Sequence, residues 1–237
     1  MPLLTKKIPL LFLLIAFGKL LNAQNYHDSS LALATYKNIL GTNMPLFIGS
    51  EYVDYNHVIN GNPFFESLYL TNGDVVYNGI KHSNVKFFYD ILHDDVVINN
   101  YNDTPLILVR EKVSSFTLDG HNFQQVFADT SSKNNVRGFV DVLYDGEVKF
   151  IVKRRKIIAD KPGQSFESFF SQLDEYYIFK NGNYNVVNSK NAALNILSDR
   201  KTELSKFIRQ HKLKFRKTKE SSLEQLVEYY DGLNNTK

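Results

Sequence analysis

The middle of the chain alternates hydrophobic and polar residues with the period of two that is typical of β-strands. Residues 84–91 and 148–153 show the pattern most clearly, because successive side chains of a strand point to opposite faces. The 18 Phe and 14 Tyr residues suit the half-buried surface of a sheet. Further strands are expected near residues 74–78, 95–99, 105–109, 112–118 and 122–127.

Asn-Gly and Asp-Gly pairs divide this region at short intervals, at residues 72–73, 78–79, 119–120 and 145–146. Such pairs accept the positive φ angles of tight hairpin turns. Residues 139–158 are therefore predicted to form one hairpin, and residues 176–187 a last one around Asn181-Gly182. Short strands at this spacing predict an antiparallel meander, either an open sheet or a partly closed barrel.

Helical periodicity is found towards both ends of the chain. A short helix is expected over residues 29–40, and Phe166, Phe169, Phe170 and Leu173 match one helical face. Three C-terminal helices are predicted, with Ser189 and Asp199 as caps of the first two and a Ser221/Glu224 capping box for the last. The predicted fold class is α+β, a mainly antiparallel sheet with C-terminal helices.

The first 23 residues have the layout of a cleavable signal peptide. Lys6 and Lys7 precede an apolar run over residues 8–17, and the small residue Ala23 stands before Gln24. The run is about ten residues, whereas a membrane-spanning helix needs about 20. We expect export to the periplasm or the exterior after cleavage near Ala23, with no transmembrane segment in the mature chain. An uncleaved N-terminal anchor is the alternative.

Four segments follow from these patterns: the signal peptide at residues 1–23, an N-terminal helical segment at 24–45, a β-rich domain at 46–188, and a helical region at 189–237 packed on that domain. The chain has no Cys, so neither a disulfide nor a cysteine-linked lipid can form. Removing residues 1–23 takes away three Lys and no acid, which leaves 25 basic and 25 acidic residues of the original 28 and 25. This balance argues against nucleic acid as a partner.

His93, Asp94 and Asp95 form the cluster with the most evident chemical potential. An imidazole with carboxylates can bind a divalent metal or act as an acid–base pair. Adjacent strand residues point to opposite faces, however, so the three side chains converge only if they lie in a turn. A plain turn between two strands is the simpler interpretation of these three weak candidates.

Residues 206–219 are the one marked charge feature. Lys212, Lys214, Arg216 and Lys217 are the candidate binding residues, for anionic lipid headgroups, lipopolysaccharide or acidic glycans. The simpler interpretation is a solvated helix face that ends in a basic linker, because cations suit the C-terminus of a helix.

Catalytic motifs are not evident in the sequence. There is no Cys nucleophile, no G-x-S-x-G elbow, no phosphate-binding glycine loop and no H-E-x-x-H pair. We therefore predict no catalytic residues, no metal ligands and no cofactor. The leading hypothesis is an exported non-enzymatic protein that binds an anionic envelope component or a protein partner. The alternative is a hydrolase that acts on envelope or extracellular polymers through carboxylates far apart in sequence.

Three stretches carry a resemblance to a family of uncharacterised secreted proteins of Bacteroidota. They are residues 47–52 (FIGSEY) with 61–65 (GNPFF), residues 142–149 (VLYDGEVK), and the ending from Tyr177-Ile178 to Tyr229-Tyr230. The Ala23-Gln24 junction is also similar to export signals of that group. The family has no assigned activity, so the resemblance implies export but no functional residue.

The export hypothesis predicts the N-terminus of the mature protein. Protein recovered from its native host is expected to begin at or near Gln24, as read by N-terminal sequencing or intact mass. A chain that still begins at Met1 would show that residues 1–23 are not removed.

Overall fold

The computed structural model of the protein describes residues 45–55, 59–100, 102–127, 136–160 and 168–234. The chain divides into two compact units, residues 1–47 and residues 48–237. Of the first unit only the 3-10 turn η2 (Pro45–Phe47) is described. The predicted signal peptide and the predicted helix at residues 29–40 lie outside the described residues.

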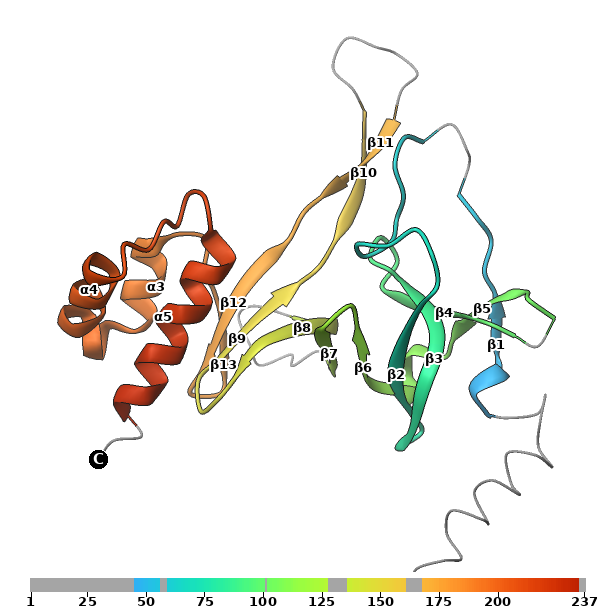
Figure 1. Cartoon of the computed structure of the whole chain (residues 1–237), viewed down its shortest axis with the longest axis horizontal. Coiled ribbons are helices and arrows are strands. Elements are labelled where there is room, and N and C mark those ends of the chain that lie inside the picture. The colour runs from blue at the N-terminus through green and yellow to red at the C-terminus, as the bar shows by residue number, and fades with distance from the viewer. Residues whose placement is uncertain (1–44, 56–58, 101, 128–135, 161–167, 235–237) are drawn as a thin grey trace, which may run out of the picture. The chain divides into compact units, whose positions relative to one another are not determined.

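The second unit contains one large antiparallel sheet and a two-stranded ribbon (Figure 1). The sheet strands are β1 (Gly49–Glu51), β2 (Thr71–Tyr77), β3 (Ile80–Asp90), β4 (Asp95–Asn99), β5 (Pro105–Leu108), β6 (Val113–Leu118), β7 (His121–Val126), β8 (Gly138–Asp145), β9 (Lys149–Lys153), β12 (Glu175–Lys180) and β13 (Asn183–Val186); η3 (Arg110–Lys112) precedes β6, and the ribbon is β10 (Lys156–Asp160) with β11 (Ser168–Gln172).

The strand order is β1-β5-β4-β3-β2-β6-β7-β8-β9-β12-β13. The chain runs outward by hairpins from β2 to β5, returns through η3 so that β6 lies on the other side of β2, and continues by neighbouring strands to β13. The predicted α+β class is therefore confirmed. Of the two alternatives for the sheet, the open one is found, since β1 and β13 remain its edges.

A cluster of aromatic rings shows how strongly this sheet coils. Tyr89 of β3 lies 6.0 Å from Phe139 of β8, centroid to centroid, although three strands separate them in the sheet order. Phe116 and Phe123 stack between them at 4.7 Å. All four rings are buried, so the concave face of the sheet encloses one aromatic core.

The helical prediction for residues 166–173 is wrong for the part that the structure describes, which begins at Ser168. Residues 168–172 form β11, which pairs with β10 in a register that places Phe170 opposite Ile158. The amide of Phe170 also donates to the carbonyl of Asn60 over 3.0 Å. Phe has a high strand propensity, and these pairings over long sequence separations override a local 3.6-residue spacing.

One predicted turn has another role. Asn72-Gly73 lies inside β2, where a Cβ on Gly73 would stand 2.0 Å from the carbonyl oxygen of Thr117. Asp145-Gly146 does turn between β8 and β9, as predicted, and Gly146 has a further role there, because a Cβ on it would stand 2.1 Å from the Asp231 carboxylate. Both glycines permit a close approach. The pairs at residues 78–79, 119–120 and 181–182 do turn between strands, with positive φ at both residues.

Three helices follow the last strand: α3 (Lys190–Ile196), α4 (Lys201–Gln210) and α5 (Lys219–Asn234), with the 3-10 turn η4 (Ser198–Arg200) before α4. Together they lie beside the β9–β12–β13 end of the sheet (Figure 1). Their apolar faces share a core with strands β9 and β12, consisting of Val148, Phe150, Val152, Ile178, Val187, Ala193, Leu194, Leu197, Leu204, Ile208, Leu223, Leu226, Val227 and Tyr230. Among the described residues, none of the helices combines the length and hydropathy of a membrane span.

The helix caps match the prediction in one case of three. The hydroxyl of Ser189 accepts from the Ala192 amide over 3.2 Å, as expected for the cap of α3. Asp199 instead binds Lys180 and the Tyr230 hydroxyl. Ser221 and Glu224 lie inside α5, because that helix begins at Lys219. The spacing of residues along the chain could not indicate that Asp199 binds Lys180 and Tyr230.

Arg154, directly after β9, connects the sheet to α5. Its Nε and Nη2 donate to Asp141 of β8, at 2.9 and 2.6 Å, and its Nη groups donate to Glu220 of α5, at 2.7 and 3.0 Å. Nη1 also donates to Asp174 over 3.0 Å, so all five N–H donors of the guanidinium have acceptors. The carboxylate of Asp141 also forms a hydrogen bond with Nδ1 of His121 over 2.7 Å, and this hydrogen bond raises the pKa of His121.

The other end of α5 is held by Asp231. Its carboxylate accepts hydrogen bonds from the Tyr144 hydroxyl and from the amides of Glu147 and Val148, over 3.0, 3.2 and 3.1 Å. Asp231 is buried. The helix is thus fixed to the β8–β9 hairpin at one end and to Arg154 at the other.

Replacing Arg154 by Leu is expected to reduce the free energy of unfolding by about 3–5 kcal/mol, because Asp141 would stay buried without its cation. Arg155→Leu is the matched control: its pair with Glu175 is exposed, and we expect a loss of about 1 kcal/mol or less. Urea denaturation of the two variants measures the difference. Equal losses would contradict the assigned role of Arg154.

Candidate functional site

The basic segment predicted from sequence forms the loop between α4 and α5. Helix α4 ends in a Schellman arrangement, in which the Leu213 amide donates to the Ile208 carbonyl (3.1 Å) and the Lys212 amide to Arg209 (3.4 Å). Lys212 has φ 53° at the position where Gly is usual. The Lys217 amide then donates to Lys214 over 2.9 Å, which closes a turn before α5.

This loop faces the segment that leads into α3, and the two line an open cavity of about 640 Å³. Its walls are Asn188, Ser189, Lys190, Asn191, Leu213, Lys214, Phe215, Arg216 and Lys217. We call this cavity the basic groove. Four of its nine lining residues are cationic and none is acidic.

The four cations of the basic groove are Lys190, Lys214, Arg216 and Lys217, and all are exposed. Within the part of the chain that the structure describes, none of them forms a salt bridge. Like charges around one cavity repel each other, and an anion in the cavity would relieve that repulsion. The groove is therefore electrostatically suited to a negative ligand.

Sequence reasoning identified three of these four cations. Lys214, Arg216 and Lys217 line the basic groove, whereas the fourth predicted residue, Lys212, does not. Lys190 was missed, because it is 24 positions before Lys214 and comes close only when α3 and α5 dock on the same core. No local signal in the sequence reveals it.

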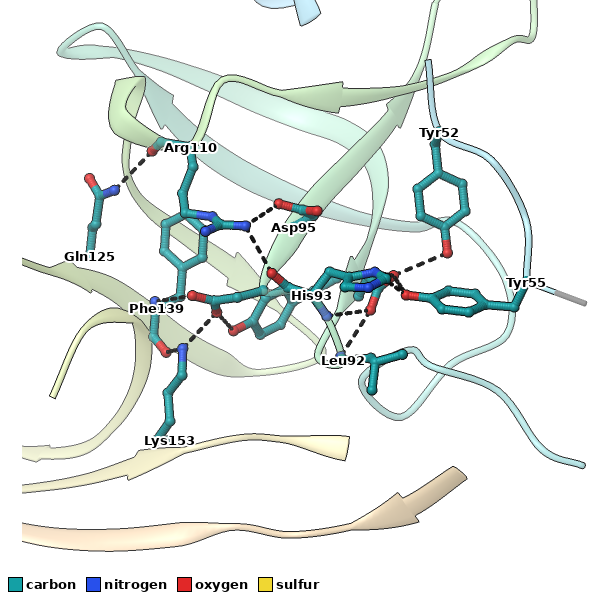
Figure 2. Close-up of polar contacts among 12 residues, drawn as sticks. Tyr52, Tyr55, Leu92, His93, Asp95, Arg110, Gln125, Phe139 and Lys153 are labelled. Atoms are coloured by element: carbon teal, nitrogen blue, oxygen red, sulfur yellow. Dashed lines mark hydrogen bonds and ion pairs between the residues drawn. The ribbon is translucent and has the colours of Figure 1, made fainter. Parts of the chain in front are cut away.

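His93, Asp94 and Asp95 do not converge on one point. They lie at the turn between β3 and β4, and their side chains have different partners, of which Figure 2 labels those of His93 and Asp95. His93 lies against the hydroxyl of Tyr55, Asp95 accepts from Arg110 at 2.6 Å, and Asp94 accepts from Lys153 at 2.7 Å. The described residues contain no group of three His, Cys, Asp or Glu side chains arranged to hold a metal.

Asp90 organises this turn and was not noticed in the sequence. Its fully buried carboxylate accepts from the hydroxyls of Tyr52 (3.2 Å) and Tyr55 (2.7 Å), and from the amides of Leu92 and His93. Burial, and then the neighbouring carboxylate of Asp90, raises the pKa of both tyrosines far above the ordinary value. Both therefore remain neutral hydrogen-bond donors that hold the turn.

A second cavity, of about 570 Å³, lies beside the turn. It is lined by the cations Arg110, Arg137, Lys153 and Arg155 and by the carboxylates Asp94, Glu111 and Glu175. Lys153 pairs with Asp94, and Arg155 with Glu175 over 3.0 Å. Burial lowers the pKa of Lys153, although Asp94 acts against this shift. The charges of this cavity largely neutralise each other, in contrast to those of the basic groove.

Comparisons of the chain with protein-family models, with curated proteins and with solved structures found no match. The resemblance to secreted proteins of Bacteroidota therefore stays a prediction.

The Schellman end of α4 yields a stability prediction. Lys212→Gly is expected to increase the free energy of unfolding by about 0.5–1 kcal/mol, because a non-glycine residue at positive φ is strained. Lys206→Gly, inside α4, is the control and should lose about 0.5–1 kcal/mol. Thermal denaturation of both variants measures the signs. A loss in both would show that Lys212 is not strained.

Proposed function

We propose that this protein is an exported, non-enzymatic protein that binds an anionic component of the cell envelope through the basic groove. The observation that carries the proposal is the composition of that groove: a cavity of about 640 Å³ with four cations and no acid in its walls. The signal-peptide pattern of residues 1–23 supports an extracytoplasmic site of action.

The arrangement of the cations supports binding over a plain solvated charge run. A helix face distributes its charges along the axis, whereas Lys214, Arg216 and Lys217 follow each other in a turn and face Lys190 from another segment. The turn is closed by backbone hydrogen bonds from the amides of Lys217 and Thr218 to Lys214, each 2.9 Å. The backbone that carries the cations is therefore pre-organised, which reduces the entropy lost on binding.

The excess of cations in the basic groove contrasts with the balanced charge of the chain as a whole. The chain that remains after residue 23 carries 25 basic and 25 acidic residues. A groove with four cations and no acid is thus not a sample of a generally basic surface. Local positive potential of this kind attracts anionic headgroups and decreases with ionic strength.

The alternative, a hydrolase, would use the carboxylates of the second cavity. Asp94 and Glu175 both line it, but Lys153 and Arg155 neutralise them at 2.7 and 3.0 Å. Both carboxylates are thus occupied in ion pairs, whereas within the described residues the cations of the basic groove form no salt bridge. The binding function is therefore the better supported of the two.

The proposal predicts that the purified protein binds vesicles of 70% phosphatidylcholine and 30% phosphatidylglycerol. Each cation near such a surface contributes about 1 kcal/mol, so the triple variant K214Q/R216Q/K217Q is expected to bind on the order of 100-fold more weakly. Vesicle co-sedimentation at 50 and 200 mM salt measures the affinity, and the wild type should bind more weakly at the higher salt.

The matched control is K201Q/K206Q/R209Q, which removes two Lys and one Arg from exposed positions of α4 outside the groove. Its affinity should stay within a few-fold of the wild type. Equal losses of vesicle affinity in the two triple variants would show that binding depends on the total charge of the protein and not on the basic groove. If the wild-type protein does not bind the vesicles, the proposal is wrong and a protein partner becomes the better hypothesis.

A further inference from the structure

The basic groove contains apolar side chains between its cations. Leu213 and Phe215 line the same cavity as Lys214 and Arg216. The side chains alternate in exposure, since Leu213 and Phe215 are half-buried against the helical core, while Lys214 between them and Arg216 after them are exposed. The cavity therefore has an apolar floor and a cationic rim.

The volume of the groove exceeds what a single inorganic anion requires. Cavities of about 300–1,000 Å³ are typical of sites for small organic ligands, and the basic groove has about 640 Å³. The aliphatic stems of Lys and Arg extend its apolar surface, because these side chains place their methylenes along apolar surface and their charge in water. A ligand that fills the groove thus contacts charge at the rim and carbon at the floor.

We infer that the basic groove binds the headgroup and the first part of the alkyl chain of an anionic amphiphile with a phosphate monoester head. The inference rests on the proposed function, which requires only an anionic envelope component, and adds the chemistry of that ligand. The phosphate lies among the ammonium and guanidinium groups of Lys190, Lys214, Arg216 and Lys217, and the chain covers Leu213 and Phe215. Asn188 and Asn191 offer neutral donors to the ester oxygens.

Three soluble probes, used below their micellar concentrations, separate head from chain: octyl phosphate, ethyl phosphate and octyl glucoside. Each further methylene that leaves water on binding increases affinity by about fourfold. We therefore expect isothermal titration calorimetry to show octyl phosphate binding at least ten times more tightly than ethyl phosphate. Octyl glucoside, which has the chain without the charge, should bind more weakly than octyl phosphate.

Two variants assign the two ends of the ligand. Phe215→Ala is expected to reduce the preference for octyl over ethyl phosphate. Lys217→Gln should weaken the binding of both phosphates and leave the ratio of the two affinities unchanged. Phe207→Ala is the matched control, because Phe207 is half-buried against the same helical core, stacks on Tyr229, and does not line the groove. Circular dichroism melting confirms that each variant is folded.

Each outcome has a distinct meaning. If octyl and ethyl phosphate bind with equal affinity, and Lys217→Gln weakens the binding of both, the inference of an amphiphilic ligand is wrong. The proposal that the groove binds an anion would remain intact. Absence of binding to either phosphate would overturn the phosphate amphiphile, and the vesicle assay would then decide separately whether the anionic proposal stands. If Phe215→Ala does not fold, the ratio of the affinities for octyl and ethyl phosphate in the wild-type protein still decides, because that ratio compares two ligands on an unaltered protein.

Discussion

The guanidinium group of Arg154 is the interaction on which the arrangement of this protein depends. A single buried cation binds Asp141 from the sheet, Asp174 before β12 and Glu220 from α5. Burying these charges is costly, and good geometry with every donor satisfied is the condition for compensating that cost. Arg154 therefore constrains position more than it adds net stability: α5 docks where Glu220 meets the guanidinium and Asp231 meets the β8–β9 hairpin.

The position of α5 decides in turn where the basic groove forms. The turn over residues 214–217 leads directly into that helix, so its cations are placed by the same contacts that dock Glu220. Opposite them, Lys190 is placed by α3, which packs on the same core through Ala193 and Leu194. The geometry of the basic groove is thus set by two helices that are fixed to the sheet.

Sequence patterns predicted the parts of this structure that depend on near neighbours. Alternation identified strands such as β3 and β9, and the pair Asn78-Gly79 marked a true hairpin turn. Patterns failed where a distant atom decides: Asn72-Gly73 lies inside β2, where a Cβ on Gly73 would stand 2.0 Å from the carbonyl oxygen of Thr117. Likewise, the helical spacing around Phe170 yields to pairing with Ile158 and Asn60. The candidate site follows the same rule, since the contiguous cations were visible in sequence and Lys190 was not.

The treatment of charge elsewhere in the described structure gives the basic groove its significance. Two cations with little exposure each have an acid beside them: Lys153 has Asp94, and Arg154 has Asp141. Lys180, at the edge of the helical core, has Asp199 at 2.6 Å. These pairs neutralise charge where desolvation would penalise it. The cations of the groove need no such partner to fold, because they are exposed, and they remain available for an anion from outside the chain. The structure thus uses acids to satisfy the cations that hold the fold, and leaves unneutralised those that surround the groove.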